Sequence, residues 1–430
     1  MDVMLYTRVT SMTFSTLHRL LPPGASDDAA RLVTVRGLRG FADGMVSVLL
    51  AAYLLDLGFS PGQVGVLVTA TLLGSAALTL GVGLFGARLT PRQVLLGACV
   101  LMLVTGLGFA GLTSFWPLLL VAVVGTLNPS GGDVSVFLPT EQSLLTSTVP
   151  AQGRTALFAR YNLSGTFAAA LGALCAGIPV AAAKAFDVDT VDAQRSGFLL
   201  YAAVAVVAAT IYTRMPVANT PRPVTRAAPL AKSRDIVLRL SAVFAIDSFG
   251  GGFVVQSLVV LWLFERFDLS VATAGAVFFV AGLLAAFSQL VSAWLAQRIG
   301  LVRTMVYTHI PANLCLIATA FMPTAPLAVA MLLLRTSMSQ MDVPARQSYV
   351  MAMVPTEERP AAASVTNVPR SLASAGAPAL AGYLLGLSTF GWFLIIGGVI
   401  KLTYDLLFLS MFASRRPEEE LVTVVQSHTA

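Results

Sequence analysis

Ionisable side chains interrupt several long apolar stretches of this 430-residue chain. In a setting as apolar as a bilayer, a charged side chain is costly and usually marks an ion or substrate pathway or a buried pair. The carboxylates are Asp43, Asp133, Glu141, Asp247, Asp342 and Asp405. The basic residues are Arg36, Arg39, Arg335, Arg346, Arg370 and Lys401. The former could bind protons and the latter an anion, but their equal number favours internal pairing over a polyvalent ionic substrate.

Asp43, Asp133 and Asp247 are the carboxylates expected to line a pathway. Asp133 has no basic residue within one helical turn, whereas Asp43 follows Arg39 by four residues. Asp133 also follows Asn128-Pro129, where proline is expected to kink the helix and free backbone carbonyls. We expect Asp133 to gain and lose a proton during function; the alternative is a structural role, capping freed backbone amides. The predicted substrate or proton pathway is Asp43, Asn128, Asp133, Asp247, Gln256, Arg335 and Arg370.

Two further groups are interpreted as structural. His309 is the only histidine inside a long apolar stretch and stands just before Pro311. A proton-relay role for His309 is not favoured. Lys401 and Asp405 are four residues apart, so they are predicted to pair locally on one helix face.

One phrase of the sequence occurs twice, 205 residues apart. Pro139, Gln142, Ser143, Val149, Pro150, Arg154 and Asn162 recur at this offset as Pro344, Gln347, Ser348, Val354, Pro355, Arg359 and Asn367. The chain is therefore predicted to be a duplicated unit of about 200 residues. Glu141 corresponds to Arg346, and parallel repeats put such mates at equal depth. We expect Glu141 and Arg346 to form a cytoplasmic gate pair when that side closes, with Asp342 as the competing partner of Arg346.

Twelve apolar stretches are long enough to cross a bilayer, which takes about 20 residues. Their approximate ranges are 33–57, 62–86, 92–112, 116–148, 155–182, 196–213, 238–263, 272–296, 303–322, 326–354, 361–388 and 391–413. Only 11% of the residues are charged, against about 25% in a soluble domain. The sequence predicts an all-α integral membrane protein with twelve transmembrane helices in two parallel six-helix repeats. Its expected parts are an N-terminal tail (1–30), a first half (31–213), a connector (214–237), a second half (238–413) and a C-terminal tail (414–430).

Arginines gather in the loops on one side of these stretches. By the positive-inside rule, both termini and the connector are predicted to be cytoplasmic in the cell inner (plasma) membrane. The net charge of +6 thus reflects orientation in the lipid bilayer, and binding to nucleic acid is not expected. The three cysteines, Cys99, Cys175 and Cys315, are far apart and have no metal-ligand spacing, so neither a disulfide nor a metal site is expected.

The loops after the second and eighth stretches carry a related pattern. They read Gly83-Leu-Phe-Gly-Ala87-Arg88-Leu-Thr-Pro-Arg92 and Leu295-Ala296-Gln297-Arg298-Ile-Gly300-Leu-Val-Arg303. With twelve spans and a basic connector, this resembles the major facilitator superfamily, whose loop signature is roughly Gly-x-Leu-Ala-Asp-Arg-x-Gly-Arg-Arg. The resemblance assigns a cytoplasmic loop motif to Gly83, Arg88, Arg92, Arg298, Gly300 and Arg303. The acidic position is replaced by Ala87 and Gln297, so the family's cytoplasmic latch would be absent or built differently.

The resemblance implies a secondary active transporter of a small molecule that works by alternating access, with the site between the halves. The carboxylates make proton coupling plausible, and no phosphate-binding loop suggests use of ATP. Export of a small amphipathic or toxic compound is favoured, partly because the stretch from Gly376 to Gly382 resembles the family's proline-glycine motif. Proton-coupled uptake of an organic anion or metabolite is the alternative, and a non-transporting membrane sensor is a remote one. No enzyme activity, no cofactor and a monomeric state are expected.

Overall fold

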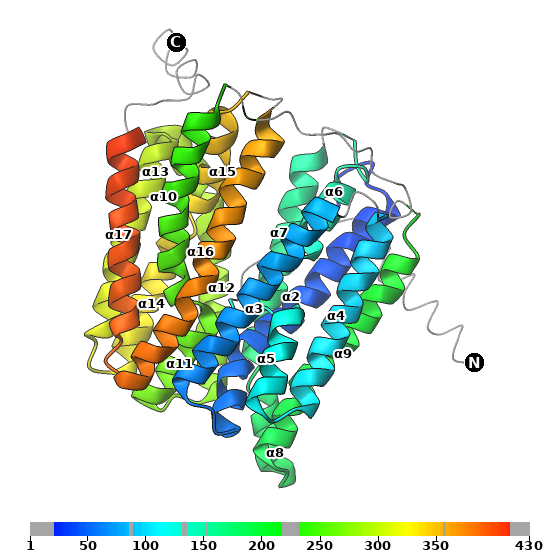
Figure 1. Ribbon diagram of the computed structural model, residues 1–430, viewed down its shortest axis with the longest axis vertical. Coiled ribbons are helices and arrows are strands. Elements are labelled where there is room, and N and C mark those ends of the chain that lie inside the picture. Colours follow the sequence, from blue (N-terminus) through cyan, green and yellow to red (C-terminus); the bar gives the residue numbers. More distant parts are fainter. Residues whose placement is uncertain are drawn as a thin grey trace.

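The computed structural model describes residues 21–85, 89–130, 136–150, 153–216, 230, 232–355 and 358–412. In this part of the chain all regular secondary structure is α-helical, and Figure 1 shows the helices in two bundles that stand side by side. Eight of the helices described are long and apolar enough to cross a membrane. The prediction of an all-α membrane protein in two halves is confirmed.

The first bundle is formed by the helices between residues 27 and 213. They are α2 (Asp27–Asp56), α3 (Pro61–Phe85), α4 (Pro91–Gly111), α5 (Phe115–Val124), α6 (Phe137–Leu145), α7 (Arg154–Cys175), α8 (Ile178–Phe186) and α9 (Thr190–Thr213). The second bundle is formed by the helices between residues 234 and 412. They are α10 (Arg234–Phe253), α11 (Gln256–Phe267), α12 (Val271–Ile299), α13 (Leu301–Ala320), α14 (Ala325–Ser339), α15 (Asp342–Ala352), α16 (Arg359–Leu387) and α17 (Trp392–Phe412).

Each of the twelve predicted spans coincides with one helix or with two consecutive helices. Spans four, seven and ten are interrupted deep inside the bundles, between α5 and α6, α10 and α11, and α14 and α15. Asn128-Pro129 lies in the first of these breaks, where a kink was expected from the proline. Gly250–Gly252 ends α10, which fits the poor helix propensity of glycine. These breaks bring helix ends and polar side chains to the interior. The connector boundaries stay a prediction, because residues 217–229 and 231 lie outside the described residues.

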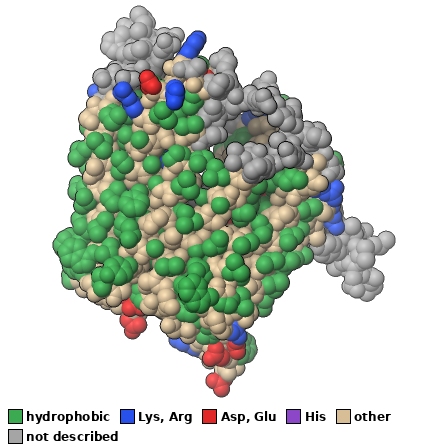
Figure 2. Space-filling view, viewed as in Figure 1, with side chains coloured by type: hydrophobic (Ala, Val, Ile, Leu, Met, Phe, Trp, Pro, Cys, Tyr) green, Lys and Arg blue, Asp and Glu red, His purple; other side chains and the backbone are tan. Residues whose placement is uncertain are grey.

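The outer surface is apolar along most of its length. Figure 2 shows hydrophobic side chains spread over the face, with the charged side chains gathered toward its two ends. Trp116, Phe287 and Leu290 leave 75%, 66% and 71% of their area exposed, which would be costly in water. Such a band is expected of helices that face lipid tails.

The two halves pack tightly at one end of the molecule. There α3 contacts α16, and α7 contacts α12. A Cβ atom at Gly65 would lie 2.6 Å from the backbone oxygen of Pro378 and 2.9 Å from the Cα atom of Gly382, so glycine permits this approach. The hydroxyl of Thr69 accepts a hydrogen bond of 2.8 Å from the backbone N–H of Ala379 across the same contact.

At the other end, where α6 and α15 lie, the bundles separate. Figure 1 shows this end at the top, and Figure 2 shows the surface hollowed there between the halves. The loop motifs at the ends of α3 and α12 belong to this end. The tight end is the one predicted to be extracellular, so the conformation is open toward the predicted cytoplasmic side.

Candidate functional site

A compact ionic cluster, here called the N-half cluster, lies inside the first bundle. Arg39 on α2 donates to Glu141 on α6, with Nη2 2.7 Å from Oε2, and both side chains are almost fully buried. The hydroxyls of Tyr161 on α7 and Tyr212 on α9 also donate to Glu141. The Arg39 guanidinium carbon lies 4.0 Å from the ring centroid of Phe137. A single carboxylate thus receives three donors from three helices, which is the satisfied arrangement that a buried ion pair requires.

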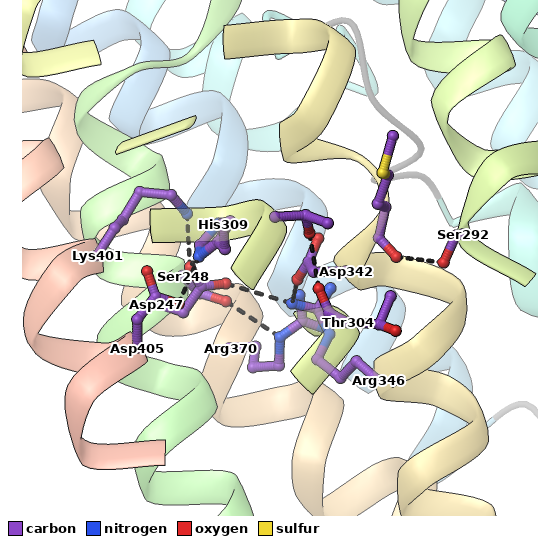
Figure 3. Close-up of polar contacts among 12 residues, drawn as sticks. Asp247, Ser248, Ser292, Thr304, His309, Asp342, Arg346, Arg370, Lys401 and Asp405 are labelled. Carbon is purple, nitrogen blue, oxygen red and sulfur yellow. Dashed lines mark hydrogen bonds and ion pairs between the residues drawn. The ribbon is translucent and has the colours of Figure 1, made fainter. Parts of the chain in front are cut away.

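A second cluster, the C-half cluster, lies inside the other bundle and is drawn in Figure 3. Its centre is Asp247 on α10, whose Oδ1 lies 2.5 Å from Nζ of Lys401 on α17. The Asp247 Oδ2 lies 3.3 Å from Nη1 of Arg346 on α15. The same Arg346 nitrogen lies 2.8 Å from Oδ2 of Asp342. Asp247 is therefore shared between cations from two other helices.

His309 on α13 stands between two carboxylates of the C-half cluster. Its Nδ1 lies 2.8 Å from Oδ1 of Asp405 on α17, and its Nε2 lies 3.8 Å from Oδ1 of Asp247. Asn313, one turn further along α13, donates to the other oxygen of Asp405 at 2.9 Å. His309 is only 2% exposed. A neutral imidazole donates from one nitrogen, and an imidazolium donates from both. His309 can therefore direct an N–H toward either Asp405 or Asp247 when it is neutral, and toward both when it is protonated.

The sequence interpretation of two of these residues was wrong. Lys401 and Asp405 do not form the predicted local pair; Lys401 contacts Asp247 and Asp405 contacts His309 and Asn313. For His309 the sequence did not favour a proton relay, and its place between two carboxylates was not anticipated. The i, i+4 pairing of His309 and Asn313 in an apolar helix was the readable signal, because both polar groups then lie on one face and need partners.

The cytoplasmic gate residues are separated in this conformation. Glu141 pairs with Arg39 in its own half, and Arg346 pairs with Asp342 and Asp247 in its own half. The competing contact between Asp342 and Arg346 is the one observed. The pair of Glu141 and Arg346 was predicted for the state closed on the cytoplasmic side, so it stays a prediction for that state.

The predicted pathway residues fall into several places. Asp43 is half-buried on α2, and Asn128 is buried, where its Oδ1 accepts from the Ser130 hydroxyl at 2.7 Å. Gln256, at the start of α11, donates to the Ser47 hydroxyl of the other half at 2.9 Å. The backbone N–H of Ser257 donates to the Pro129 carbonyl at 3.2 Å. Gln256 and the segment around Asn128 therefore meet at the junction between the halves. Asp133 lies outside the described residues.

Arg335 on α14 and Arg370 on α16 belong to the second bundle, as Figure 1 shows for their helices. Arg370 donates to the Ser248 hydroxyl from Nε at 3.1 Å and to the Asn367 amide oxygen from Nη1 at 3.3 Å. Ser248 directly follows Asp247, so Arg370 adjoins the C-half cluster. The Nε of Arg335 is buried without an acceptor. Both residues thus bring positive charge to the interior of the second half.

The loop motif is partly described. Gly83 lies in the last turn of α3 and Arg92 in the first turn of α4. Gly300 has a φ of 87° between α12 and α13, a value that favours glycine. The Arg298 guanidinium carbon lies 4.2 Å from the Trp294 ring centroid, and Arg303 lies in the first turn of α13. Arg88 is outside the described residues, and the role of the motif stays a prediction.

Sequence reasoning missed the two phenols of the N-half cluster. Tyr161 and Tyr212 lie on helices that follow Glu141 by 20 and 71 residues, so no local spacing connects them. Only the packing of α7 and α9 around α6 reveals the contact. The residues that the structure describes contain no group of three or more His, Cys, Asp or Glu side chains placed to hold a metal ion.

Known proteins similar to this chain agree with this architecture. The sequence profile described as the Major Facilitator Superfamily matches residues 32–341. An uncharacterized membrane protein of Saccharomyces cerevisiae is 26% identical over 426 residues, which covers 90% of this chain and 94% of the yeast protein.

Solved structures similar to this chain include several transporters. The inward-open xylose transporter XylE from E. coli has a TM-score of 0.71 at 15% identity and covers 92% of this chain and 99% of its own. The nucleoside transporter NupG has a TM-score of 0.70 at 14% identity, with coverage of 89% and 98%. A bacterial homolog of the human lysosomal transporter Spinster, inward-facing, has a TM-score of 0.67 at 14% identity, with coverage of 93% and 98%. At these identities the likeness concerns the fold.

Proposed function

Since the chain belongs to the Major Facilitator Superfamily, we propose that it couples secondary transport of a small amphipathic molecule to protons, and that the proton is carried by the C-half cluster. Secondary transport of a small molecule across a membrane follows from the family. The single observation that carries the coupling is His309, buried between the carboxylates of Asp405 and Asp247. Histidine is the side chain whose charge changes most readily near neutral pH.

Several other helices of the second half bring a charged or titratable group to His309 or to its carboxylate partners. Those groups are Lys401, Tyr404 and Asp405 on α17, Asp247 on α10, and Arg346 with Asp342 on α15. Asp247 also lies within electrostatic reach of Arg335 on α14 and Arg370 on α16. A proton on His309 therefore changes the charge balance of six helices at once.

Protonation of His309 would compete with the existing partners of Asp247. It adds a positive charge 3.8 Å from a carboxylate oxygen that Lys401 already contacts at 2.5 Å. Of the two hydrogen bonds that Asp247 accepts from Lys401 and Arg346, the one from Arg346 is longer, at 3.3 Å, so it is the one expected to weaken. Because Arg346 is on α15 at the open end, release of this contact would let α15 move relative to α10. A proton would thereby bias the equilibrium between two arrangements of the helices.

The sequence indicated two directions, export in exchange for protons and uptake together with protons. The proline-glycine motif that favoured export lies on α16, where Pro378 and Gly382 contact Gly65. The motif therefore lies in the contact that closes one end of the molecule. Such a contact fits alternating access whether the molecule is exported or taken up. We propose the plasma membrane as the location, with both termini cytoplasmic, on the arginine asymmetry of the loops alone.

The test begins with a ligand screen and ends with flux. Ligands are found by the rise in melting temperature that binding to the folded state produces, and the purified full chain is then placed in liposomes with an imposed pH gradient. Accumulation driven by an acidic lumen indicates exchange for protons, and accumulation driven by an acidic exterior indicates symport. Flux that ignores the gradient in both polarities contradicts proton coupling, and binding without flux would favour a sensor.

Two variants separate the proton carriers. His309→Gln should abolish accumulation against a gradient yet keep exchange of labelled for unlabelled ligand, because the amide can donate and accept but cannot be protonated near neutral pH. Asp133→Asn tests the carrier predicted from the sequence. Loss of coupling in Asp133→Asn with normal coupling in His309→Gln would move the proton site out of the C-half cluster.

A further inference from the structure

Positive charge exceeds negative charge in the interior of the second half. Among the described residues there, the cations are Arg335, Arg346, Arg370 and Lys401, and the carboxylates are Asp247, Asp342 and Asp405. All three carboxylates are engaged, by Lys401, by Arg346 and by His309. The excess is therefore one positive charge when His309 is neutral, and among the described residues neither Arg335 nor Arg370 has a carboxylate partner. A lone charge inside a membrane protein is expensive, so it indicates a charge that is supplied from outside the chain.

Arg370 is the cation that lies at a cavity and lacks a carboxylate. Its hydrogen-bond partners, Ser248 and Asn367, are both neutral. Within the described part of the chain, no carboxylate oxygen lies within the 4.0 Å that would make an ion pair with it. The positive charge of Arg346 is close enough to act on Arg370 unfavourably. Hydrogen bonds to neutral groups orient the guanidinium but do not neutralise it.

The cavity beside Arg370 has a composition that suits one end of an amphipathic anion. Its volume is about 50 Å³, several times the roughly 10–15 Å³ that one water needs. The polar side of its wall is made by Arg346, Gln347, Thr366, Asn367 and Arg370. The apolar side is made by Phe244, Val350, Met351 and Ala363. Two guanidinium groups therefore share one small space with a hydrocarbon surface.

We propose that this cavity binds the carboxylate group of the transported molecule, an organic monocarboxylate with an apolar body. The inference rests on the proposed transport function and names its substrate class. Arginine can offer a carboxylate two parallel hydrogen bonds, which a point charge such as lysine cannot. One carboxylate matches the single excess charge of the cluster. The apolar wall accepts the body of the molecule, so a polyvalent or wholly polar anion is expected to bind less well.

The site also sets the sense of coupling. Arg370 contacts Ser248, whose neighbour Asp247 lies 3.8 Å from His309. A proton on His309 raises the excess positive charge of the same cluster, so it attracts the anion rather than competing with it. Proton and monocarboxylate therefore bind together, and the transport is symport.

The experiment uses three ring compounds of similar shape and different charge: benzoate, benzamide and benzylamine. Thermal unfolding of the purified full chain is measured with each one, for the unaltered chain and for Arg370→Gln, Arg370→Lys and Arg160→Gln. Arg160 is the matched control, because its guanidinium donates to the Ala156 carbonyl of its own helix, in the other half. Benzoate should raise the melting temperature of the unaltered chain and of Arg160→Gln, and the rise should be larger at about pH 6 than at about pH 8 if a proton on the C-half cluster favours the anion. Benzamide and benzylamine should not raise it.

Arg370→Gln should weaken benzoate binding by about tenfold or more, the effect of losing one charged hydrogen-bond partner. Arg370→Lys should recover part of the affinity. Without ligand, Arg370→Gln should melt no lower than the unaltered chain, because it removes a cation that has no counter-ion. The proposal is overturned if benzoate gives no shift, if Arg370→Gln binds it equally well, or if benzamide binds as well as benzoate. Proton-driven flux of a neutral compound would overturn the proposed carboxylate site but would leave the proposed transport function intact. Benzoate binding without flux would support the carboxylate site but would contradict the transport function.

Discussion

The two halves contain ionic clusters at related positions, but the signs of the charges on the corresponding helices are opposite. In the N-half cluster a cation on α2, Arg39, meets an anion on α6, Glu141. In the C-half cluster an anion on α10, Asp247, meets a cation on α15, Arg346. Glu141 and Arg346 are repeat mates, so the same span position holds the opposite charge in each half. The equivalent positions 141 and 346 therefore hold opposite charges, and each charge is paired within its own half.

The main difference between the two clusters is how fully their charged groups are paired. Glu141 is surrounded by one arginine and two phenols, side-chain types whose ordinary pKa values lie far from neutral pH. The C-half cluster contains a histidine, shares Asp247 among its partners and holds an arginine without a carboxylate. The difference indicates a division of labour in which the first half provides a fixed contact and the second half provides the groups that respond to protons and anions.

The largest effect is expected from breaking the fixed pair. Glu141→Gln neutralises the buried carboxylate that receives Arg39, Tyr161 and Tyr212, so it should lower the free energy of unfolding by about 3 kcal/mol or more. The double variant Arg39→Met with Glu141→Leu should recover much of that loss, because it removes both charges. The measurement is thermal and denaturant unfolding of the purified protein.

The control for this prediction is the pair of Arg195 and Asp192, which is 2.5 Å apart but has 57% of the Asp192 side chain exposed. Asp192→Asn should change stability little, because exposed ion pairs contribute little. If Glu141→Gln is as stable as Asp192→Asn, the N-half cluster is not the structural contact described here.

A smaller effect is expected from exchanging charge between the clusters. Glu141→Arg and Arg346→Glu should each impair transport, because each places like charges together in its own half. If the two positions approach when the cytoplasmic side closes, the double exchange should restore part of the flux. The measurement is proton-driven uptake in liposomes. A double variant that is no better than either single variant would show that the two clusters stay separate throughout the cycle.

Much of this fold could be predicted from the sequence, because the membrane imposes strong rules. Lengths of apolar sequence predicted every span, and Asn128-Pro129 predicted the break in span four. The repeat at offset 205 predicted that Glu141 and Arg346 are equivalent. The contact of Asp342 with Arg346 was also readable, since it joins residues one turn apart on one helix.

The pairing between helices could not be predicted in the same way. Lys401 and Asp405 have the spacing of a local pair, yet each is drawn to a partner on another helix. Which neighbour a buried charge selects depends on the packing of α10, α13 and α17, and spacing within one helix does not encode it. Asp133 was predicted to carry the proton because its own span contains no basic residue. The structure instead places His309 between two carboxylates, which lie 62 and 96 residues away in the sequence.

The smallest effect is expected from substitutions that report topology. Single cysteines at Lys184 and Lys232, in a chain whose native cysteines are replaced, should leave transport unchanged because both positions lie near helix ends outside the clusters. Position 184 should react with an impermeant thiol reagent added to intact cells, and position 232 should not. The reverse labelling pattern would invert the orientation, and the open end would then face outward.

The most direct test of the division of labour is the number of protons taken up when ligand binds. Calorimetry with benzoate in two buffers of different ionisation enthalpy measures it, because protons exchanged with the buffer contribute its heat. The account predicts a binding enthalpy that differs between buffers for the unaltered chain and for Tyr161→Phe in the N-half cluster, and that is the same in both buffers for His309→Gln. An unaltered chain that takes up no proton, or a His309→Gln variant that still does, would contradict it.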